Sequence, residues 1–216
     1  LPAADYKLVA HINDRSIYSF CMCPGGYVVN ASSEQGCLVT NGMSNNKRDA
    51  KNANSALLVN VNVEDYYKGD VLDGVSFLRK YESLAYEKYG NFTVPVQLVG
   101  DFINSTPSVA LGGVIPTIKP AYKLGSIDDV LPDFVVNTLR EGLKVLDTKL
   151  HGFAASDAVM SAIETRSSAP VRIKRTSNLS TSIPNVYAAG EGSGYAGGIT
   201  TSAIDAIKIA MKIIEN

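Results

Sequence analysis

The sequence predicts an α/β fold of the mixed α+β kind, and three observations support this prediction. Short runs with β-strand patterning fill most of the first 63 residues. Two later segments, 73–89 and 133–150, carry apolar residues at helical spacing. The chain ends with a short apolar run, a glycine-rich turn and a third helical pattern. With 216 residues, it is long enough to bury a sizeable core.

Composition limits the class of protein. Hydrophobic residues make up 45% and charged residues 19%, which is ordinary for a soluble globular protein. The formal net charge of −1 and the lack of a basic run argue against nucleic acid as a partner. No apolar run is long enough to span a bilayer, so no membrane partner is expected. The three cysteines make no disulfide framework, which favours a cytoplasmic protein.

The first 63 residues are expected to form five strands, at 6–10, 16–22, 27–31, 37–40 and 55–63. The last one has valine or leucine at every second position from Leu57 to Val63, the pattern of a half-buried strand. Turns are predicted at the consecutive residues Pro24, Gly25 and Gly26, and at Asn41–Gly42. The polar stretch 45–54 is expected to be a surface loop.

Two helices are predicted in the middle of the chain. The first begins at Asp73, which suits an N-cap, and ends before Gly90, which suits a C-cap. The second covers 133–150, with a stripe of leucine and valine along one face. Strands are expected at 94–100, 159–165 and 171–175, and an irregular connection at 112–123 because of its glycines and prolines.

The C-terminal stretch combines a strand, a glycine turn and a helix. Val186–Ala189 indicates a short buried strand. The helical pattern after the turn runs to Ile214, and its wide apolar face is expected to be mostly buried. Such a turn at a helix N-terminus lets backbone N–H groups point at an anion.

Within this turn, Gly192–Gly197 matches the G-x-G-x-x-G pattern of dinucleotide-binding units. It does not open such a unit, because the helix reaches Asn216 with no second strand and no acidic residue to hold a ribose. It is not a P-loop, because no Gly-Lys-Ser/Thr follows. A helix cap selected for tight packing alone is the less favoured alternative. Bare backbone suits close approach to a ligand, so we predict that the turn completes a site whose main part lies elsewhere.

The segment Glu164–Ile173 is a second candidate site. It holds a glutamate, two arginines and two serines around a predicted strand–turn–strand. These side chains could line a polar cleft, since arginine suits planar anions. A surface hairpin with solvated charges explains them equally well.

Cys21 and Cys23 invite a redox or metal interpretation. Cys-x-Cys places both thiols on one face of a strand, yet a disulfide at that spacing is strained and uncommon. Cys37, His11 and His151 bring no complete ligand set, so no metal site is expected. Two small buried thiols are the favoured account, and a substrate-facing thiol is the alternative.

Several blocks together resemble the bacterial FAD-dependent dehydrogenases often labelled NAD(FAD)-utilizing dehydrogenases. The matching blocks, in the family's order, are 19–26, 31–34, 39–44, 53–56, 100–102, 164–173 and 190–199. The resemblance covers nearly the whole chain, but the family's N-terminal G-x-G-x-x-G unit, which grips the FAD pyrophosphate, is missing. Together with a start at Leu1 rather than methionine, this indicates a piece of a longer protein.

The resemblance implies an oxidoreductase that transfers hydride between FAD and a small-molecule substrate, with NAD(P)H as a candidate electron donor. It implies a substrate-side domain at 1–180 and the last strand and helix of a Rossmann-like FAD-binding domain at 181–216. The implied cofactor-binding residues are Gly190, Glu191, Gly192, Gly194, Tyr195, Ala196, Gly197, Gly198 and Ile199. Weaker candidates for the same cleft are Pro24, Gly25, Gly26, Glu164, Arg166 and Pro170. The piece by itself is expected to be inactive and to hold FAD weakly or not at all.

The rival interpretation is a non-catalytic, β-rich module that binds an anion through its glycine turn. Uptake of FAD by the full-length protein distinguishes the two, because only the flavoprotein is expected to be yellow. The resemblance identifies neither catalytic residues nor an oligomeric state.

Overall fold

The structure, a computed structural model, describes residues 7–215. Two mixed sheets and four α-helices in this part confirm the predicted mixed α/β class. The chain forms two compact units. Unit 1 holds the chain up to Asn62 together with Arg79–Glu164, and unit 2 holds Val63–Leu78 together with the chain from Thr165 onward. The division into domains at 180 and 181 stays a prediction.

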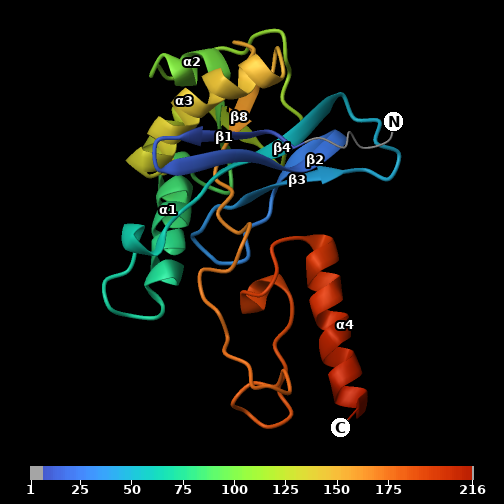
Figure 1. Ribbon diagram of the computed structural model, residues 1–216. Helices are drawn as coiled ribbons and strands as arrows, with labels where there is room; N and C mark the ends of the chain where they lie inside the picture. The colour runs from blue at the N-terminus through green and yellow to red at the C-terminus, as the bar shows by residue number, and fades with distance from the viewer. Residues whose placement is uncertain (1–6, 216) are drawn as a thin grey trace. The chain divides into compact units, whose positions relative to one another are not determined.

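The larger sheet of unit 1 is built around one long strand, β2 (Figure 1). Its strands are β1 (Val9–Ile12), β2 (Arg15–Asn30), β3 (Thr40–Ser44), β4 (Asn52–Val59) and β6 (Ile118–Lys119). β1 pairs antiparallel with the start of β2, where Ile17 lies between Ala10 and Val59, and β4 pairs antiparallel with β2 from Ile17 as far as Gly26. β3 pairs antiparallel and β6 parallel with the second half, on either side of Val28.

The turn predicted at Pro24–Gly26 is wrong, because these residues lie inside β2 and join the predicted strands 16–22 and 27–31. The register against β4 shifts on both sides of Cys23, which marks a bulged segment. Proline is tolerated at a bulge because it has no N–H to give to the ladder. At Gly25, φ is +54° and a side chain would lie 2.1 Å from the carbonyl oxygen of Arg48, so only glycine fits.

The turn predicted at Asn41–Gly42 is wrong as well. Both residues lie in β3, where they pair with Val29 and Val28. A side chain at Gly42 would begin 2.1 Å from the Oδ1 atom of Asn54. Glycine is therefore required in the sheet by close packing of the Asn54 amide, and it does not turn the chain.

The other strand predictions in this region differ at their ends. β1 begins at Val9, and Tyr6, the first residue of the strand predicted at 6–10, lies outside the described residues. β3 begins where the strand predicted at 37–40 ends. The predicted loop 45–54 contributes the first residues of β4, and the predicted strand 55–63 ends early, before the 3-10 turn η1 (Val63–Asp65).

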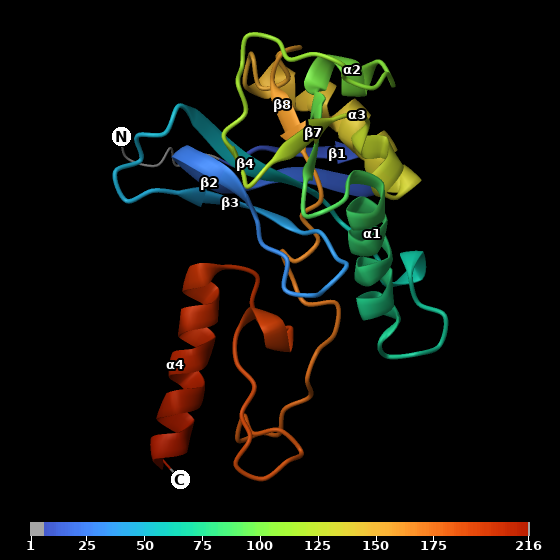
Figure 2. The same ribbon diagram turned by 180° about the vertical axis from the view of Figure 1, so that it is seen from behind.

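The smaller sheet of unit 1 has β5 (Val94–Leu98) at its centre. β7 (Tyr122–Leu124) pairs parallel with β5 on one side, and β8 (Val159–Ser161) pairs antiparallel on the other (Figure 2). The strand predicted at 94–100 ends early because α2 (Val99–Ile103) follows β5 directly. The strand predicted at 159–165 is limited to β8, and the stretch 112–123 contains β6 and the start of β7.

α1 (Asp73–Tyr89) and α3 (Asp133–Lys149) confirm the two predicted helices. α1 is followed by Gly90 at φ +69°, the left-handed conformation expected of a glycine C-cap. Asp73 does not act as the expected N-cap. Its Oδ2 accepts the backbone N–H groups of Lys68 (2.6 Å) and Asp70 (2.9 Å), which fixes the preceding loop and lowers the pKa of Asp73.

α3 packs across the larger sheet (Figure 1). Gly142 allows close contact, because a side chain there would begin 2.5 Å from Cγ2 of Ile17. Ile17 belongs to one buried apolar cluster that also contains Phe102, Leu143 and Leu146. Unit 1 therefore has its own core, formed by the two sheets and the helices against them.

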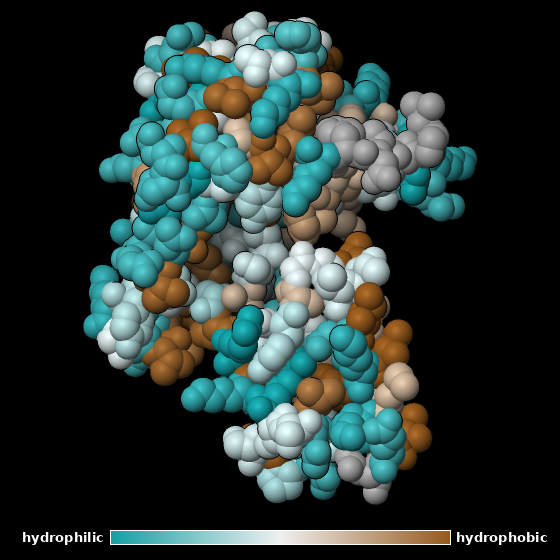
Figure 3. Space-filling view, in the orientation of Figure 1, coloured by the Kyte–Doolittle hydropathy of each residue, from teal (hydrophilic) through white to brown (hydrophobic). Residues whose placement is uncertain are grey.

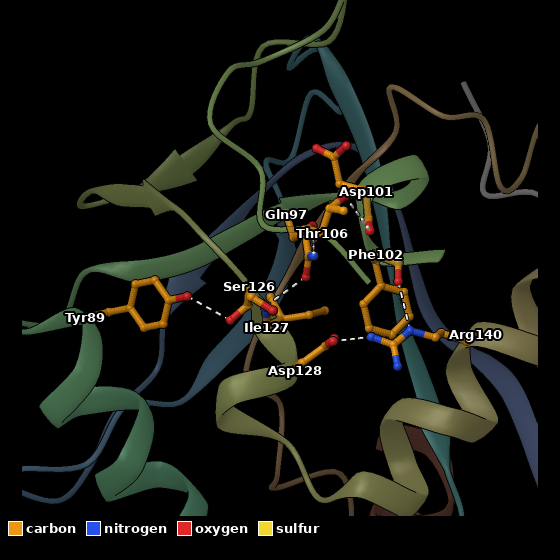
Figure 4. Close-up of polar contacts among 9 residues, drawn as sticks. All are labelled: Tyr89, Gln97, Asp101, Phe102, Thr106, Ser126, Ile127, Asp128 and Arg140. Carbon is orange, nitrogen blue, oxygen red and sulfur yellow. Dashed lines mark hydrogen bonds and ion pairs between the residues drawn. The ribbon is translucent and has the colours of Figure 1, made fainter. Parts of the chain in front are cut away.

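Buried polar side chains fasten the segment between β7 and α3 to the rest of unit 1 (Figure 4). Gln97 of β5 is fully buried, and its amide donates to the carbonyl of Thr106 (2.7 Å) and accepts the N–H of Ile127 (2.9 Å). Ile127 begins the 3-10 turn η2 (Ile127–Val130). Arg140 of α3 pairs with Asp128 in this turn. The two bonds of the Gln97 amide satisfy a polar group that would be costly to bury alone.

Unit 2 beyond Thr165 consists of loops, the 3-10 turn η3 (Glu191–Ser193) and α4 (Ile199–Glu215). The strands predicted at 171–175 and 186–189 are wrong, because neither segment is a strand in the described chain. The carbonyl of Val186 accepts hydrogen bonds from the backbone N–H and the hydroxyl of Thr181, a neighbour in the same loop. A short apolar run becomes a strand only where another strand supplies its ladder.

α4 confirms the predicted C-terminal helix, but the expected burial of its apolar face is wrong. Ile209 is the buried apolar residue of this helix among those described. Exposed apolar residues follow α4 along its length (Figure 3); the large ones are Ile199, Ile204, Ile207, Met211, Ile213 and Ile214. The amphipathic pattern was correct, but the described chain provides no cover for it.

Candidate functional site

The glycine turn of unit 2 is shaped by two glycines. Gly190 has φ +75° and Gly194 has φ +82°, and η3 lies between them. The N–H of Gly194 donates to the carbonyl of Glu191 (2.9 Å), and the N–H of Tyr195 donates to the carbonyl of Gly190 (3.3 Å). A side chain at Gly194 would begin 2.5 Å from the carbonyl oxygen of Val171. Backbone conformation and packing therefore require glycine at these two positions.

Asp205 of α4 pins the turn to the helix. Its Oδ2 accepts the N–H of Gly190 (2.8 Å), and its two oxygens accept bonds from Arg175 at 2.9 and 2.7 Å. Arg175 also donates to Oγ of Ser193 (3.0 Å), and that hydroxyl donates to the carbonyl of Gly190 (2.9 Å). The Arg175 side chain is only 5% exposed, so the bidentate pair is largely removed from water.

This pairing changes both ionisation equilibria. Hydrogen bonds from Arg175, and then from the Gly190 N–H, lower the pKa of Asp205 to about 2. The same bonds with Asp205 raise the pKa of Arg175. Both groups are therefore charged across the physiological range, and the turn is held by a permanent ion pair.

Tyr195 lies against two guanidinium groups. The Arg175 guanidinium is 3.6 Å from the centre of the tyrosine ring, and the Arg172 guanidinium is 5.0 Å from it. Arg172 also donates to the carbonyl of Gly194 (2.9 Å). The ring is thereby fixed beside the turn while part of it remains exposed.

The remaining glycines of the turn leave backbone open. A side chain added at Gly192 or Gly197 would meet no atom within 4 Å, and one at Gly198 would meet only Oγ1 of Thr201, at 3.7 Å. Gly197 and Gly198 directly precede α4, whose first N–H groups have no intrahelical acceptor. The arrangement can accept a flat or anionic ligand close to the backbone.

The weaker candidates are divided between the two units. Pro24, Gly25 and Gly26 lie in β2 of unit 1, and Glu164 is the last residue of that unit. Arg166 and Pro170 belong to unit 2, where Pro170 packs on Gly74. Burial raises the pKa of Glu164 to about 7, so its carboxyl changes protonation state near neutrality. That these residues share one cleft stays a prediction.

Residues 7–215 contain no group of three His, Cys, Asp or Glu side chains placed to hold a metal ion. Within the same range, no helix has both the length and the apolar character needed to cross a membrane.

Comparison with known proteins gives the chain a family. Residues 1–167 match the family described as "FAD-dependent protein, C-terminal domain-like". The chain belongs to this family. The match confirms the resemblance to FAD-dependent proteins, and it supports association of the longer protein with FAD.

A relative shows how the chain compares with a longer protein. An uncharacterized protein from Clostridium beijerinckii is 50% identical over 219 residues, which cover 100% of this chain and 41% of the relative. The chain therefore spans less than half of the relative's length.

In this member of the FAD-dependent family, the sequence pattern did not reveal the two residues that hold the turn, Arg175 and Asp205. Asp205 could have been found, because it is a single acid within the apolar helical pattern 203–211. Arg175 had no signal of its own, since it follows Arg172 and Lys174 in a stretch that was expected to be a strand. Its role depends on the loop conformation of unit 2.

Proposed function

We propose that this chain is the C-terminal part of an FAD-dependent oxidoreductase that transfers hydride between the flavin and a small organic substrate. The observation that carries the proposal is the open backbone at Gly192, Gly197 and Gly198, in a turn that Asp205 and Arg175 hold rigidly. The family match and the greater length of the Clostridium relative support it.

The residues of the turn fit a flavin because no side chain stands between the backbone and a planar ligand at Gly192 and Gly197. Gly190 and Gly194 shape the turn, and Gly192, Tyr195, Ala196, Gly197, Gly198 and Ile199 are proposed to lie beside the cofactor. Glu191 is proposed to lie near the ribityl chain, on the ground of the resemblance. FAD, when bound, supplies the two-electron chemistry. The N-terminus of α4 favours negative charge next to it.

Glu164 is proposed to line the substrate cleft on the ground of the resemblance, and burial raises the pKa of its carboxyl to about 7. Arg166, Pro170 and the Pro24–Gly26 segment are proposed to line the same cleft. A nicotinamide nucleotide, NAD(P)H, is the proposed electron donor on the ground of the resemblance alone.

Residues 181–216 are proposed to belong to the FAD-binding domain of the longer protein, and residues before them to a substrate-side domain. Two features of unit 2 support this division. The segment Val186–Ala189 is apolar yet does not form a strand in the described chain, and large apolar residues of α4 are exposed. We propose that both pack against a sheet of the longer protein.

Titration of this 216-residue chain with FAD tests whether the chain holds only part of the FAD site. We expect no saturable binding in the micromolar range, because the turn is only one part of the site.

The longer protein that contains this chain should bind FAD with a shifted flavin spectrum, and NADH or NADPH should bleach that spectrum without oxygen. Tight binding by the short chain would contradict the view that the site is divided. A colourless longer protein that takes up no FAD would favour a non-catalytic module that binds an anion at the turn.

A further inference from the structure

Cys21 and Cys23 lie at the bulge of β2, in unit 1, and the proposed function does not use them. The expectation of two buried thiols is wrong for this pair, because Cys21 is exposed and Cys23 is half-buried. None of the three cysteines, all within the described chain, is in a disulfide. The exposed position of Cys21 makes its sulfur accessible to a small reactant.

The bulge brings the two residues together. In a regular strand, residues two apart are separated by roughly 6.6 Å, near the upper limit for a disulfide. Here φ of Cys21 is +48°, and the register against β4 shifts between Phe20 and Cys23. The Sγ of Cys23 lies 3.4 Å from the carbonyl oxygen of Cys21, so this thiol is directed back toward Cys21.

The pairing with β4 is interrupted on both sides of Cys23. The ladder with β4 resumes at Cys23, opposite Asn54, and shifts again before Gly26. Sγ of Cys23 is 3.8 Å from the position that a Cβ of Gly42 would occupy, so it lies over bare backbone. Pro24, Gly25 and Gly26 follow without long side chains. The ladder is therefore interrupted around Cys23, whereas Gly25 and Gly26 pack closely on the carbonyls of Arg48 and Met43, so any rearrangement is confined to Cys21–Cys23.

We propose that Cys21 and Cys23 form a redox-active pair that exchanges electrons with low-molecular-weight disulfides. The Cys21 thiolate attacks a disulfide RS–SR, forming a Cys21–S–S–R bond and releasing one RSH after protonation. The Cys23 thiol then attacks Sγ of Cys21, which forms the Cys21–Cys23 disulfide and releases the second RSH. The pair loses two electrons, the small disulfide gains them, and the two thiol protons end on the two RSH molecules. A small dithiol reverses the reaction, and neither direction requires flavin.

Cys37 serves as the internal control. It is buried, and its thiol lies 3.6 Å from the hydroxyl of Ser83. It should remain a thiol under conditions that oxidise the pair.

The test uses the reduced 216-residue chain in a series of glutathione redox buffers, followed by acid quenching, alkylation and mass spectrometry. Cleavage at Glu34, between the pair and Cys37, gives separate peptides. We expect the peptide with Cys21 and Cys23 to lose two hydrogens and both alkylation sites, while Cys37 stays alkylated. Cys23→Ser should instead accumulate glutathione on Cys21, since no second thiol resolves the mixed disulfide.

Three results would overturn the proposal. One is a wild-type chain that accumulates glutathione adducts as Cys23→Ser does. Another is oxidation that gives only disulfide-linked dimers. The third is a pair that stays reduced even in the most oxidising glutathione buffer, in which Cys21 of the Cys23→Ser variant carries glutathione.

Discussion

Asp205 is the residue on which the glycine turn of unit 2 depends. It joins α4 to Gly190 through a backbone N–H and to Arg175 through two hydrogen bonds. Removal of one partner of such an ion pair leaves the other charge buried and unpaired. The resulting loss of stability is larger than the net stabilisation that the intact pair provides. Arg175 is the more buried partner, so the penalty falls mainly on its guanidinium.

Asp205→Asn should loosen the turn at neutral pH. We expect a cost of about 3 kcal/mol for the local structure, because the Arg175 charge stays buried. Amide hydrogen exchange over 186–206 should then be roughly 100-fold faster than in the wild type. Glu215→Gln is the matched control on the same helix. Its partner Lys212 lies in an exposed pair, so its removal should cost under about 1 kcal/mol.

The stabilisation provided by the Asp205–Arg175 pair should depend on pH in the acid range. The pKa of Asp205 is about 2 in the folded chain and about 4 when unfolded. The stabilisation is therefore complete above about pH 4 and is lost as the pH falls through 2. In NMR spectra, the Gly190 amide shift should titrate with this low pKa in the wild type and show no such titration in Asp205→Asn. A midpoint near 4 in the wild type would contradict the pairing.

At the scale of elements, helices were predicted well and glycine signals were not. Apolar spacing predicted α1, α3 and α4 because a helix depends mainly on its own residues. Pro24–Gly26 and Asn41–Gly42 have the composition of turns, yet they lie in strands. Glycine is required at these places by close contact with residues distant in sequence, the Arg48 carbonyl and the Asn54 amide. No local sequence pattern reveals these contacts.

The candidate site shows the same division. The glycine turn could be located from its sequence, because a dense run of small residues at 190–198 directly precedes an apolar helix. The sequence does not say which glycines shape the turn and which leave its backbone open. That distinction depends on φ angles and on the position of the Val171 carbonyl, and both are properties of the fold. The Arg175–Asp205 pair spans 30 residues and could not be inferred from spacing.

The exposed face of α4 tests the proposed domain division. Ile207 is 59% exposed, so Ile207→Lys should change the stability of the 216-residue chain by less than about 0.5 kcal/mol. In the longer protein, where this face is proposed to lie against the FAD-binding sheet, the buried ammonium should cost more than about 2 kcal/mol. Thermal unfolding of both proteins measures the difference. Lys208→Ala, at the next position of the helix, is the control and should be neutral in both. Equal tolerance of Ile207→Lys in the two proteins would remove the support for the division.

At the scale of the whole molecule, the two units differ in how complete they are. Unit 1 has two sheets, a helix across the larger one and a continuous buried cluster. The family match, which covers residues 1–167, corresponds largely to this unit and to the segment of unit 2 inserted in it. Unit 2 beyond Thr165 has one long helix with an exposed apolar face and an ordered glycine turn. We account for this contrast by the proposal that the turn and α4 complete a flavin site in a longer chain.

The flavin content of the longer Clostridium beijerinckii relative, which is 50% identical to this chain, tests that claim most directly. The absorbance spectrum of the purified protein, with extraction and quantification of the cofactor, gives the ratio of FAD to protein. We expect a yellow protein with about one FAD per chain. Replacing the residue that aligns with Gly197 by valine should weaken retention of the cofactor. A colourless protein that takes up no FAD on titration, while remaining folded, would contradict that claim.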